Sequence, residues 1–323
     1  MKNIVRAAVL VAAAATSTTI AVPAARASED IADQYPQSEL YSKPVEVIPH
    51  VFSAIGATAP PTYENSGHNN NLSFIVTDEG VVVMNAGASA RLAAALHAEI
   101  KTVTDQPVVL VINENGQGHA MLGNSYWRDQ GVDILAHLDA VEETTENGDF
   151  ILQGMQRYNR DKAEGTRVEH ANLTFEEEYD ITLGGVEIKV LHLGPAHDPG
   201  DLQVWIPQWE LMITGDIAFH ERMLPIFETT CTSCWLETWE EKLEPLAPTY
   251  VIPGHGHPTN FAQVRRYTRD YLLDLRTKIQ DHLDSGDLAG AYYVDQSRWD
   301  HLDTFEELAT KNAGRVFAEM EWE

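Results

Sequence analysis

Residues 111–124 read VINENGQGHAMLGN, and this stretch decides the fold. An apolar strand is predicted over residues 108–112, just after Pro107, and it runs into a loop of small and polar residues. A short helix is expected from His119 to Gln130. A rigid strand that ends in such a loop presents the loop side chains at a sheet edge, where a ligand can approach them. The loop is therefore the first candidate site.

Three later segments have the same form, in which an apolar strand ends in a glycine-containing turn that carries His or Asp. They are GPAHDPGD at 194–201, TGD at 214–216 and IPGHGHP at 252–258. Their candidate metal ligands are His197, Asp216 and His255, because imidazole and carboxylate are the groups that hold a catalytic zinc. One histidine after a strand is usually a hydrogen-bonded surface residue. Four such segments in order indicate one shared site.

The remaining pattern predicts an α/β fold in which helices cover two facing sheets. A hairpin is expected from strands at 72–76 and 81–85, followed by a helix at 88–102. The charged section 142–178 predicts a helix and a surface excursion. Further strands are expected at 179–183, 186–193, 202–206, 211–214 and 250–252, and helices at 235–246, from 261 to a break at 285–286, and at 304–320.

The first 27 residues have the order of a secretory signal peptide. Lys2 and Arg6 precede an apolar run at 7–15, and small residues at 25–27 form a cleavage site after Ala27. The run is too short to span a bilayer, and no later stretch is long enough. We therefore expect a periplasmic or secreted protein without a transmembrane segment. An uncleaved amphipathic anchor is the alternative.

The chain is strongly acidic, with a formal charge of −27. Removal of residues 1–27 takes away Lys2, Arg6 and Arg26 and no acid, so the mature chain carries −30. Such a surface repels nucleic acid and anionic membranes. A small-molecule substrate is therefore expected rather than nucleic acid, and the sequence indicates no particular protein partner.

Cys231 and Cys234 form the chain's only cysteine pair, CTSC. In an oxidising compartment a close pair favours a local disulfide. A redox-active pair and two soft metal ligands are the other readings of this spacing.

With these motifs the chain resembles the metallo-β-lactamase superfamily, in particular its exported hydrolase-like members. The resemblance covers about Val45 to Tyr271 and rests on residues 80–87, 111–124, 194–197, 214–216 and 253–256. It implies a four-layer αββα sandwich with up to two metal ions at the sheet edge. The expected organisation is a signal peptide (1–27), an N-terminal arm (28–44), the metallo-β-lactamase-like domain (45–260) and C-terminal helices (261–323).

The metal ligands that the resemblance implies are only partly present. By position, Asn115, Gln117 and His197 would hold a first metal. His119, Ala120 and His255 would hold a second, with Asp216 bridging the two. Asn115 and Gln117 are neutral amides and weak zinc ligands, and the methyl group of Ala120 binds nothing. Asn85 stands where the family has an aspartate that supports the metal loop.

His119 can replace a lost ligand, because with Asp216 and His255 it makes two histidines and one carboxylate. Three protein ligands with an open position are typical of a catalytic zinc or a non-haem iron. We therefore expect one zinc rather than two, with iron or manganese as alternatives, and Asp216 and His197 as catalytic residues. The predicted function is a metal-dependent hydrolase acting on an ester, amide or lactam bond. A metal-free binding protein on the same fold is the alternative, and a redox role of the cysteine pair is a third hypothesis.

Overall fold

The computed structural model describes residues 35–323, so the predicted signal peptide and its cleavage site lie outside the described residues. The first sheet has the strand order β1 to β7, and the second has the order β12-β11-β10-β9-β8. The strands are β1 Val45–Ile48, β2 Val51–Ala54, β3 Leu72–Thr77, β4 Gly80–Met84, β5 Val108–Ile112, β6 Asp133–His137, β7 Leu173–Phe175, β8 Glu178–Leu183, β9 Val186–Leu191, β10 Gln203–Ile206, β11 Leu211–Phe219 and β12 Tyr250–His255. The α-helices are α1 Ala90–Val103, α2 Gly118–Met121, α3 Asn124–Asp129, α4 Leu138–Asn159, α5 Thr232–Thr238, α6 Phe261–Tyr267, α7 Arg269–Ser285, α8 Leu288–Ala291 and α9 Phe305–Met320.

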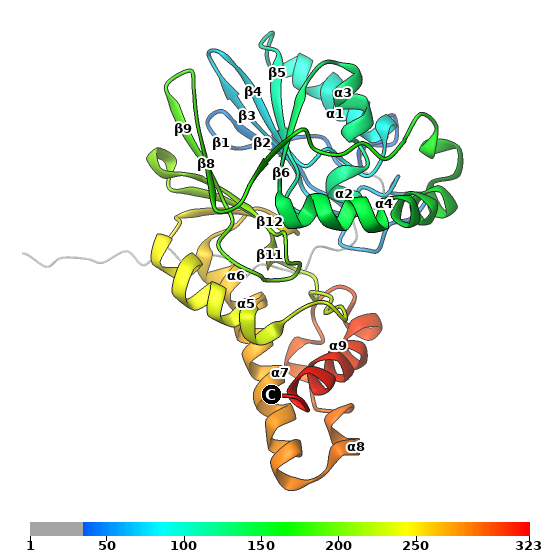
Figure 1. The fold of residues 1–323 in the computed structure, drawn as a ribbon, viewed down its shortest axis with the longest axis vertical. Coiled ribbons are helices and arrows are strands. Elements are labelled where there is room, and N and C mark those ends of the chain that lie inside the picture. The colour runs from blue at the N-terminus through cyan, green and yellow to red at the C-terminus, as the bar shows by residue number, and fades with distance from the viewer. Residues whose placement is uncertain (1–34) are drawn as a thin grey trace, which may run out of the picture.

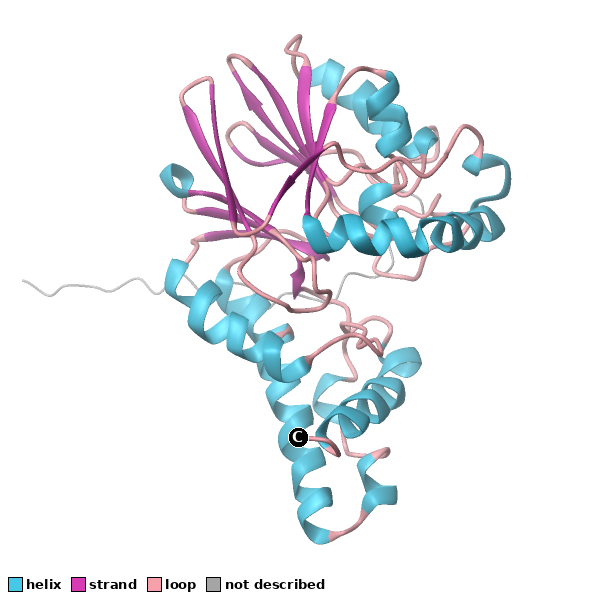
Figure 2. Ribbon diagram, viewed as in Figure 1, coloured by secondary structure: helices cyan, strands magenta, loops and turns pink. Residues whose placement is uncertain are grey.

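The two sheets face each other, and helices cover their outer faces (Figures 1 and 2). Alternation along the strands creates this layering, because successive side chains of a strand point to opposite faces. In β4, Val81 and Val83 pack under the helices, whereas Val82 and Met84 pack between the sheets. The predicted four-layer αββα sandwich is therefore confirmed.

The C-terminal helices complete the outer layer of the second sheet. Met212 of β11 and Val251 of β12 share one buried core with Val264 of α6 and Tyr271 of α7. The core continues into α9 through Val316, and α7 to α9 form a lobe that projects from the sandwich (Figure 1). The C-terminal helical extension is thus continuous with the sandwich in its packing.

Several expected elements differ from the structure, including the helix expected from 261 to 285, which is divided at Thr268 into α6 and α7, and two of the differences lie near the predicted ligands. The helix expected at 119–130 is divided into α2 and α3, because the chain turns at Leu122 and Gly123. A Cβ at Gly123 would lie 2.1 Å from the carbonyl oxygen of Ala86, so the close contact of this turn with the β4 loop needs a glycine. Strand β11 also continues past the expected end at Thr214 to Phe219, through an irregularity at Gly215.

The ends of several strands meet at one edge. Parallel pairing brings the end of β4 beside that of β5, and β11 is parallel to β12, with Phe219 opposite His255. Asn71, just before β3, joins the two halves: its amide donates hydrogen bonds to the carbonyls of Pro253 (2.8 Å) and Gly256 (2.7 Å). The loops that carry the predicted ligands are thus held together. Over residues 35–323, no helix has both the length and the apolar character needed to cross a bilayer.

Candidate metal centre

Three of the predicted ligands converge at this edge. One ligand atom each of His119, Asp216 and His255 lies within 4.8 Å of the others. Nε2 of His119 is 3.4 Å from Oδ2 of Asp216, and Nε2 of His255 is 3.2 Å from Oδ1. All three side chains are largely buried. The Asp216 carboxylate lies between the two imidazoles, because each of its oxygens faces a different histidine.

Two glycines make room for the Asp216 carboxylate. Gly215 has a φ of +57°, which favours glycine, and this conformation turns the chain within β11. A Cβ at Gly254 would lie 2.3 Å from Oδ1 of Asp216. Gly254 is therefore required because its backbone approaches the Asp216 carboxylate, whereas Gly215 is required by its positive φ and by the Glu114 side chain that lies against it.

The imidazole of His255 is oriented by a backbone carbonyl. Its Nδ1 lies 2.5 Å from the carbonyl oxygen of Asn69, which can only accept, so Nδ1 carries the proton. Nε2 is then the unprotonated nitrogen, and it is the one that faces Asp216. Burial lowers the pKa of His255 to about 4 and keeps the ring neutral. This is the arrangement that metal-binding histidines have when their other nitrogen donates to the protein.

The centre leaves carboxylate oxygens without hydrogen bonds. Both oxygens of Asp216 are buried and lack a hydrogen-bond partner, although imidazole nitrogens lie near them. Burial would raise the pKa of Asp216, but His255 and His119 outweigh it and hold the pKa below its ordinary value. A buried, ionised carboxylate without hydrogen bonds fits a cation. The residues present therefore fit a metal ion.

Glu114 lies at the same centre, although it was not among the residues predicted from the sequence. Its Oε1 is 2.9 Å from Nε2 of His119, and its side chain is 1% exposed. Burial, and then the charge of Asp216, raise the pKa of Glu114. Burial opposes protonation of His119, but Asp216 and Glu114 raise its pKa above the ordinary value. Glu114 stands two residues after the end of β5 and one residue before Asn115, and a single acid at this place has no spacing that marks it as a ligand.

His197 lies beside this cluster rather than within it. Its Nδ1 is 3.8 Å from Oδ2 of Asp216 and 3.1 Å from the amide nitrogen of Gln117. The rings of Phe227 and Trp235 contact its other side, at centroid distances of 5.0 and 5.7 Å. Burial lowers the pKa of His197 to about 4, so the ring is neutral near pH 7.

The remaining positions of the motif are used in hydrogen bonds or are apolar. The amide of Asn115 donates to Oδ1 of Asp201 at 3.1 Å. The methyl-bearing Ala120 is buried, and its carbonyl accepts from Asn113 at 2.7 Å. Burial, and then the neighbouring Asp198, hold the pKa of Asp201 well above its ordinary value. At the positions that were expected to hold the first metal, the side chains are therefore engaged in hydrogen bonds between amides and acids.

Asn85, the predicted replacement of a supporting aspartate, still orders the loop. It has a φ of +71°, and its Oδ1 accepts from the backbone N–H of Glu114 at 3.1 Å. The negative charge is absent, but the acceptor is in place. Asn85 therefore sets the direction in which the chain enters residues 114–119.

A cavity of about 440 Å³ opens onto the centre. One wall is apolar and comes from α4, with Ile151 and Met155, and α9 contributes Leu308 and Lys311. Arg222 also lines it, with Nη1 3.3 Å from Nδ1 of His255. All four residues of the segment 220–223 are buried, because this segment packs beneath the C-terminal helices.

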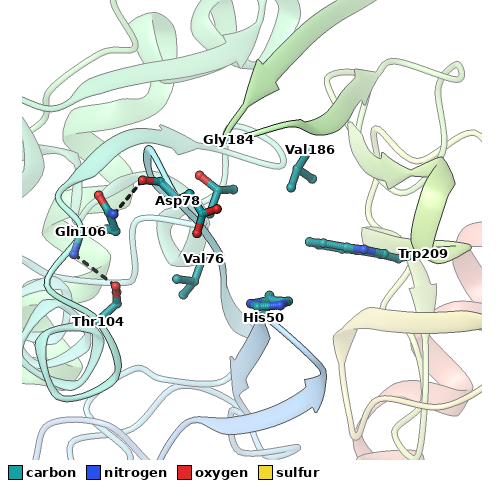
Figure 3. Close-up of a pocket in the computed structure, with 9 residues that line it drawn as sticks. His50, Val76, Asp78, Thr104, Gln106, Gly184, Val186 and Trp209 are labelled. Atoms are coloured by element: carbon teal, nitrogen blue, oxygen red, sulfur yellow. Dashed lines mark hydrogen bonds between the residues drawn. The ribbon is translucent and has the colours of Figure 1, made fainter.

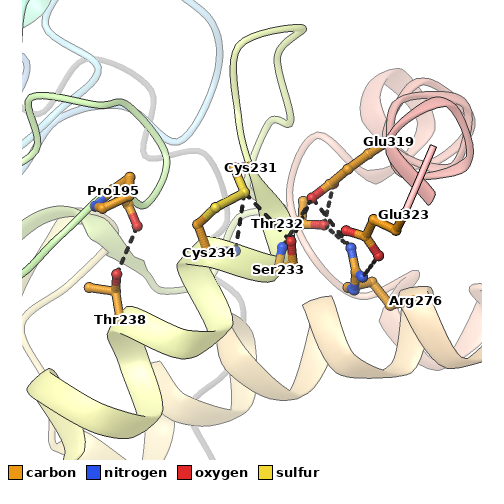
Figure 4. The surroundings of a disulfide bond; sticks show 9 residues. All are labelled: Pro195, Cys231, Thr232, Ser233, Cys234, Thr238, Arg276, Glu319 and Glu323. Atoms are coloured by element: carbon orange, nitrogen blue, oxygen red, sulfur yellow. Dashed lines mark hydrogen bonds and ion pairs between the residues drawn. A yellow bond between two sulfur atoms is a disulfide. The ribbon is translucent and has the colours of Figure 1, made fainter.

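The cysteine pair lies next to the His197 loop. Cys231 and Cys234 are joined by a disulfide at the start of α5 (Figure 4). Thr230, the residue before it, donates a hydrogen bond to the carbonyl of His197 at 2.9 Å. The bridge therefore anchors the segment that packs on His197. Within residues 35–323, neither cysteine is free to act as a metal ligand.

A second pocket, of about 250 Å³, lies at the opposite ends of the strands (Figure 3). It is lined by residues of the β3–β4 turn, Gly184 and Val186, with His50 stacked on Trp209 at a ring distance of 6.2 Å. Asp78 is its one acidic residue. Among residues 35–323, the one group of possible metal ligands lies at the first cavity rather than at this pocket.

Comparison with known proteins identifies the fold. No family model matches the chain. A metallo-β-lactamase from Pontibacter korlensis superposes with a TM-score of 0.56 at 17% identity, over 68% of this chain and 94% of that one. The DIM-1 metallo-β-lactamase gives 0.55 at 16% identity, over 70% and 94%. The stereoselective inverting sec-alkylsulfatase from Pseudomonas sp. gives 0.66 at 17% identity over 86% of this chain, which spans about half (51%) of the alkylsulfatase.

Proposed function

Because the chain has the metallo-β-lactamase fold and brings His119, Asp216 and His255 together at its sheet edge, we propose that it is a metal-dependent hydrolase with a single metal ion. The observation that carries this proposal is the buried Asp216 carboxylate between two imidazoles, with neither oxygen hydrogen-bonded. We propose zinc as the metal, with iron or manganese as alternatives that the same donors accept.

A divalent ion at this position supplies Lewis acidity, which polarises a scissile carbonyl and makes water acidic enough to ionise near neutral pH. The residues of the chain would hold this ion and move the proton. His255 and His119 would hold the ion through the nitrogens that face Asp216. Asp216 would also hold it and could accept a proton, and the neutral His197, 3.8 Å away, would be the second group able to take one. The neutral state of His197 near pH 7 suits a base.

The cavity supports a small substrate with an apolar body. Ile151, Met155 and Leu308 line one side, and Arg222 and Lys311 place two cations in the wall. An ester, amide or lactam of moderate size with an anionic group fits these walls. The similar structures are named for lactam and alkyl sulfate hydrolysis, so a chromogenic β-lactam, a carboxylic ester and a sec-alkyl sulfate form the substrate panel.

We also propose that the protein acts outside the cytoplasm. The Cys231–Cys234 disulfide supports an oxidising compartment, as does the signal-peptide pattern in the sequence.

Metal content tests the hydrolase proposal. The mature protein, produced with zinc, iron and manganese present, should carry close to one equivalent by elemental analysis. Asp216→Ala and His255→Ala should lose it, whereas His282→Ala, on α7 and outside the cavity lining, should keep it. Wild-type protein with far less than one equivalent of every metal would instead support a metal-free binding protein.

A further inference from the structure

Arg222 is a buried cation beside the centre, and several of its hydrogen-bond donors are unused. The residue is 6% exposed and lines the cavity, and its Nε is buried without a hydrogen-bond partner. The nitrogen nearest to Nη1, 3.3 Å away, is Nδ1 of His255. Because Nδ1 carries a proton that it donates to the carbonyl of Asn69, it cannot accept one from Arg222. The guanidinium therefore lacks an acceptor at both Nε and Nη1.

The charge of Arg222 is not neutralised by an ion pair. Burial lowers its pKa to about 10, although nearby acids, chiefly Asp216, oppose this, and the guanidinium therefore stays charged near pH 7. Within the described part of the chain, these acids act on it through charge alone, and none of them forms a hydrogen bond with it. A buried cation with unfilled donors is costly unless an anion accompanies it. An anion that enters the cavity would supply both the charge and the acceptors.

The position of Arg222 sets the place of such an anion. Nη1 lies against Nδ1 of the His255 ring, and Nε2 of the same ring faces Asp216 at 3.2 Å. The guanidinium is thus one imidazole ring away from the centre. Lys311 of α9, the other cation of the wall, is exposed. Arg222 is therefore the deeper of the two cations.

We propose that Arg222 binds an oxyanion of the substrate, a sulfate or carboxylate group, directly beside the bond that is cleaved. The guanidinium presents its donors in one plane, which matches the paired oxygens of such a group. The apolar side chains of Ile151, Met155 and Leu308 line the same cavity, so the body of the substrate is aliphatic. The substrate class is then an amphiphile whose negative charge adjoins the scissile bond. This choice of substrate rests on the proposed function, whereas the anion site itself requires no metal.

The test is Arg222→Met, which keeps much of the side-chain volume but removes the charge and the donors. Arg298→Met is the matched control, because Arg298 is exposed and lies outside the cavity lining. Calorimetric titration with hexyl sulfate and with hexanoate measures anion affinity, on the protein as purified and after treatment with a chelator. We expect Arg222→Met to weaken binding of the preferred anion roughly tenfold or more in both forms, and Arg298→Met to stay within about threefold of wild type. The anion that the wild type binds more tightly identifies the head group.

Thermal melting gives a second readout, which distinguishes an anion site from a merely structural arginine. Without anion, Arg222→Met should melt at or above the wild-type temperature, because it removes a buried charge with unfilled donors. Hexyl sulfate should raise the melting temperature of the wild type but not that of Arg222→Met. Arg222→Lys keeps the charge without the planar donors, so its anion affinity should lie between those of the wild type and Arg222→Met.

The outcomes separate the anion site from the hydrolase proposal. Equal anion affinity in Arg222→Met and the wild type, or a wild type that binds neither anion, would overturn the anion site, and the metal content would still decide the hydrolase proposal. A wild type that carries no metal but binds the anion through Arg222 would overturn the hydrolase proposal and leave the anion site standing.

Discussion

Asn71 should hold the two halves of the sandwich together at the metal centre. Its amide donates to the carbonyls of Pro253 and Gly256, on either side of His255, and its Oδ1 accepts from the backbone N–H of Gly56 at 3.3 Å. Asn71→Ala leaves these three buried groups without partners. Each unpartnered group costs about 1–3 kcal/mol, so the three together should lower the free energy of unfolding by about 3–9 kcal/mol.

Urea denaturation followed by tryptophan fluorescence measures this loss, and Ser73→Ala is the matched control. Ser73 is buried two residues further along and makes one side-chain hydrogen bond, to Ser53 at 2.9 Å, so its removal should cost about 1 kcal/mol. Metal affinity should fall in Asn71→Ala and stay unchanged in Ser73→Ala. Only Asn71→Ala removes hydrogen bonds that hold the turn around His255. If the two variants lose equal stability and bind metal equally, Asn71 does not hold the site.

Three other outcomes follow from particular contacts. Burial lowers the pKa of His68 to about 4, against 6.5 for the unfolded chain, so the stability it contributes is present above pH 6.5 and is lost as pH falls toward 4, by about 3 kcal/mol. The free energy of unfolding of His68→Gln should change less with pH over that interval than that of the wild type. An equal change in the two proteins would show that His68 is not the source of this pH dependence. Gly215→Ala places a Cβ against Glu114 at a φ of +57°, so it should lower stability by about 2–4 kcal/mol and abolish metal binding; a wild-type melting curve would rule out that clash. Replacing both Cys231 and Cys234 by Ser should cost about 2 kcal/mol by calorimetry, and a thiol titration of the unreduced protein that finds two reactive thiols would show that the bridge is absent.

The fold could be predicted from the sequence because its determinants are local. The unbroken apolar runs at 81–84 and 108–112 indicate strands that are buried on both faces, and glycine-containing turns mark the strand ends. The break between α2 and α3 was not predicted, since it depends on the contact of Gly123 with the carbonyl of Ala86, which comes from a distant segment.

The candidate site was predicted in part. His119, Asp216 and His255 could be named, because each follows an apolar strand in a recognisable motif, and the structure brings them within 4.8 Å. Glu114 was missed, because a single acid beside a divergent motif carries no spacing signal. Arg222 was not named as a site residue, because its segment looks polar along the chain, yet the C-terminal helices bury it beside the cavity.

Sequence alone specified the strands, the turns and the residue types that can bind a metal, since these depend on side-chain period and on the chemistry of single residues. Tertiary structure decided which of those residues form a centre. It aligned Glu114 with Gly215, turned Nε2 of His255 toward Asp216, and directed Gln117 to His197 and Asn115 to Asp201. The physical reason is that a metal site requires donor atoms a few ångströms apart, and packing between distant segments sets those distances.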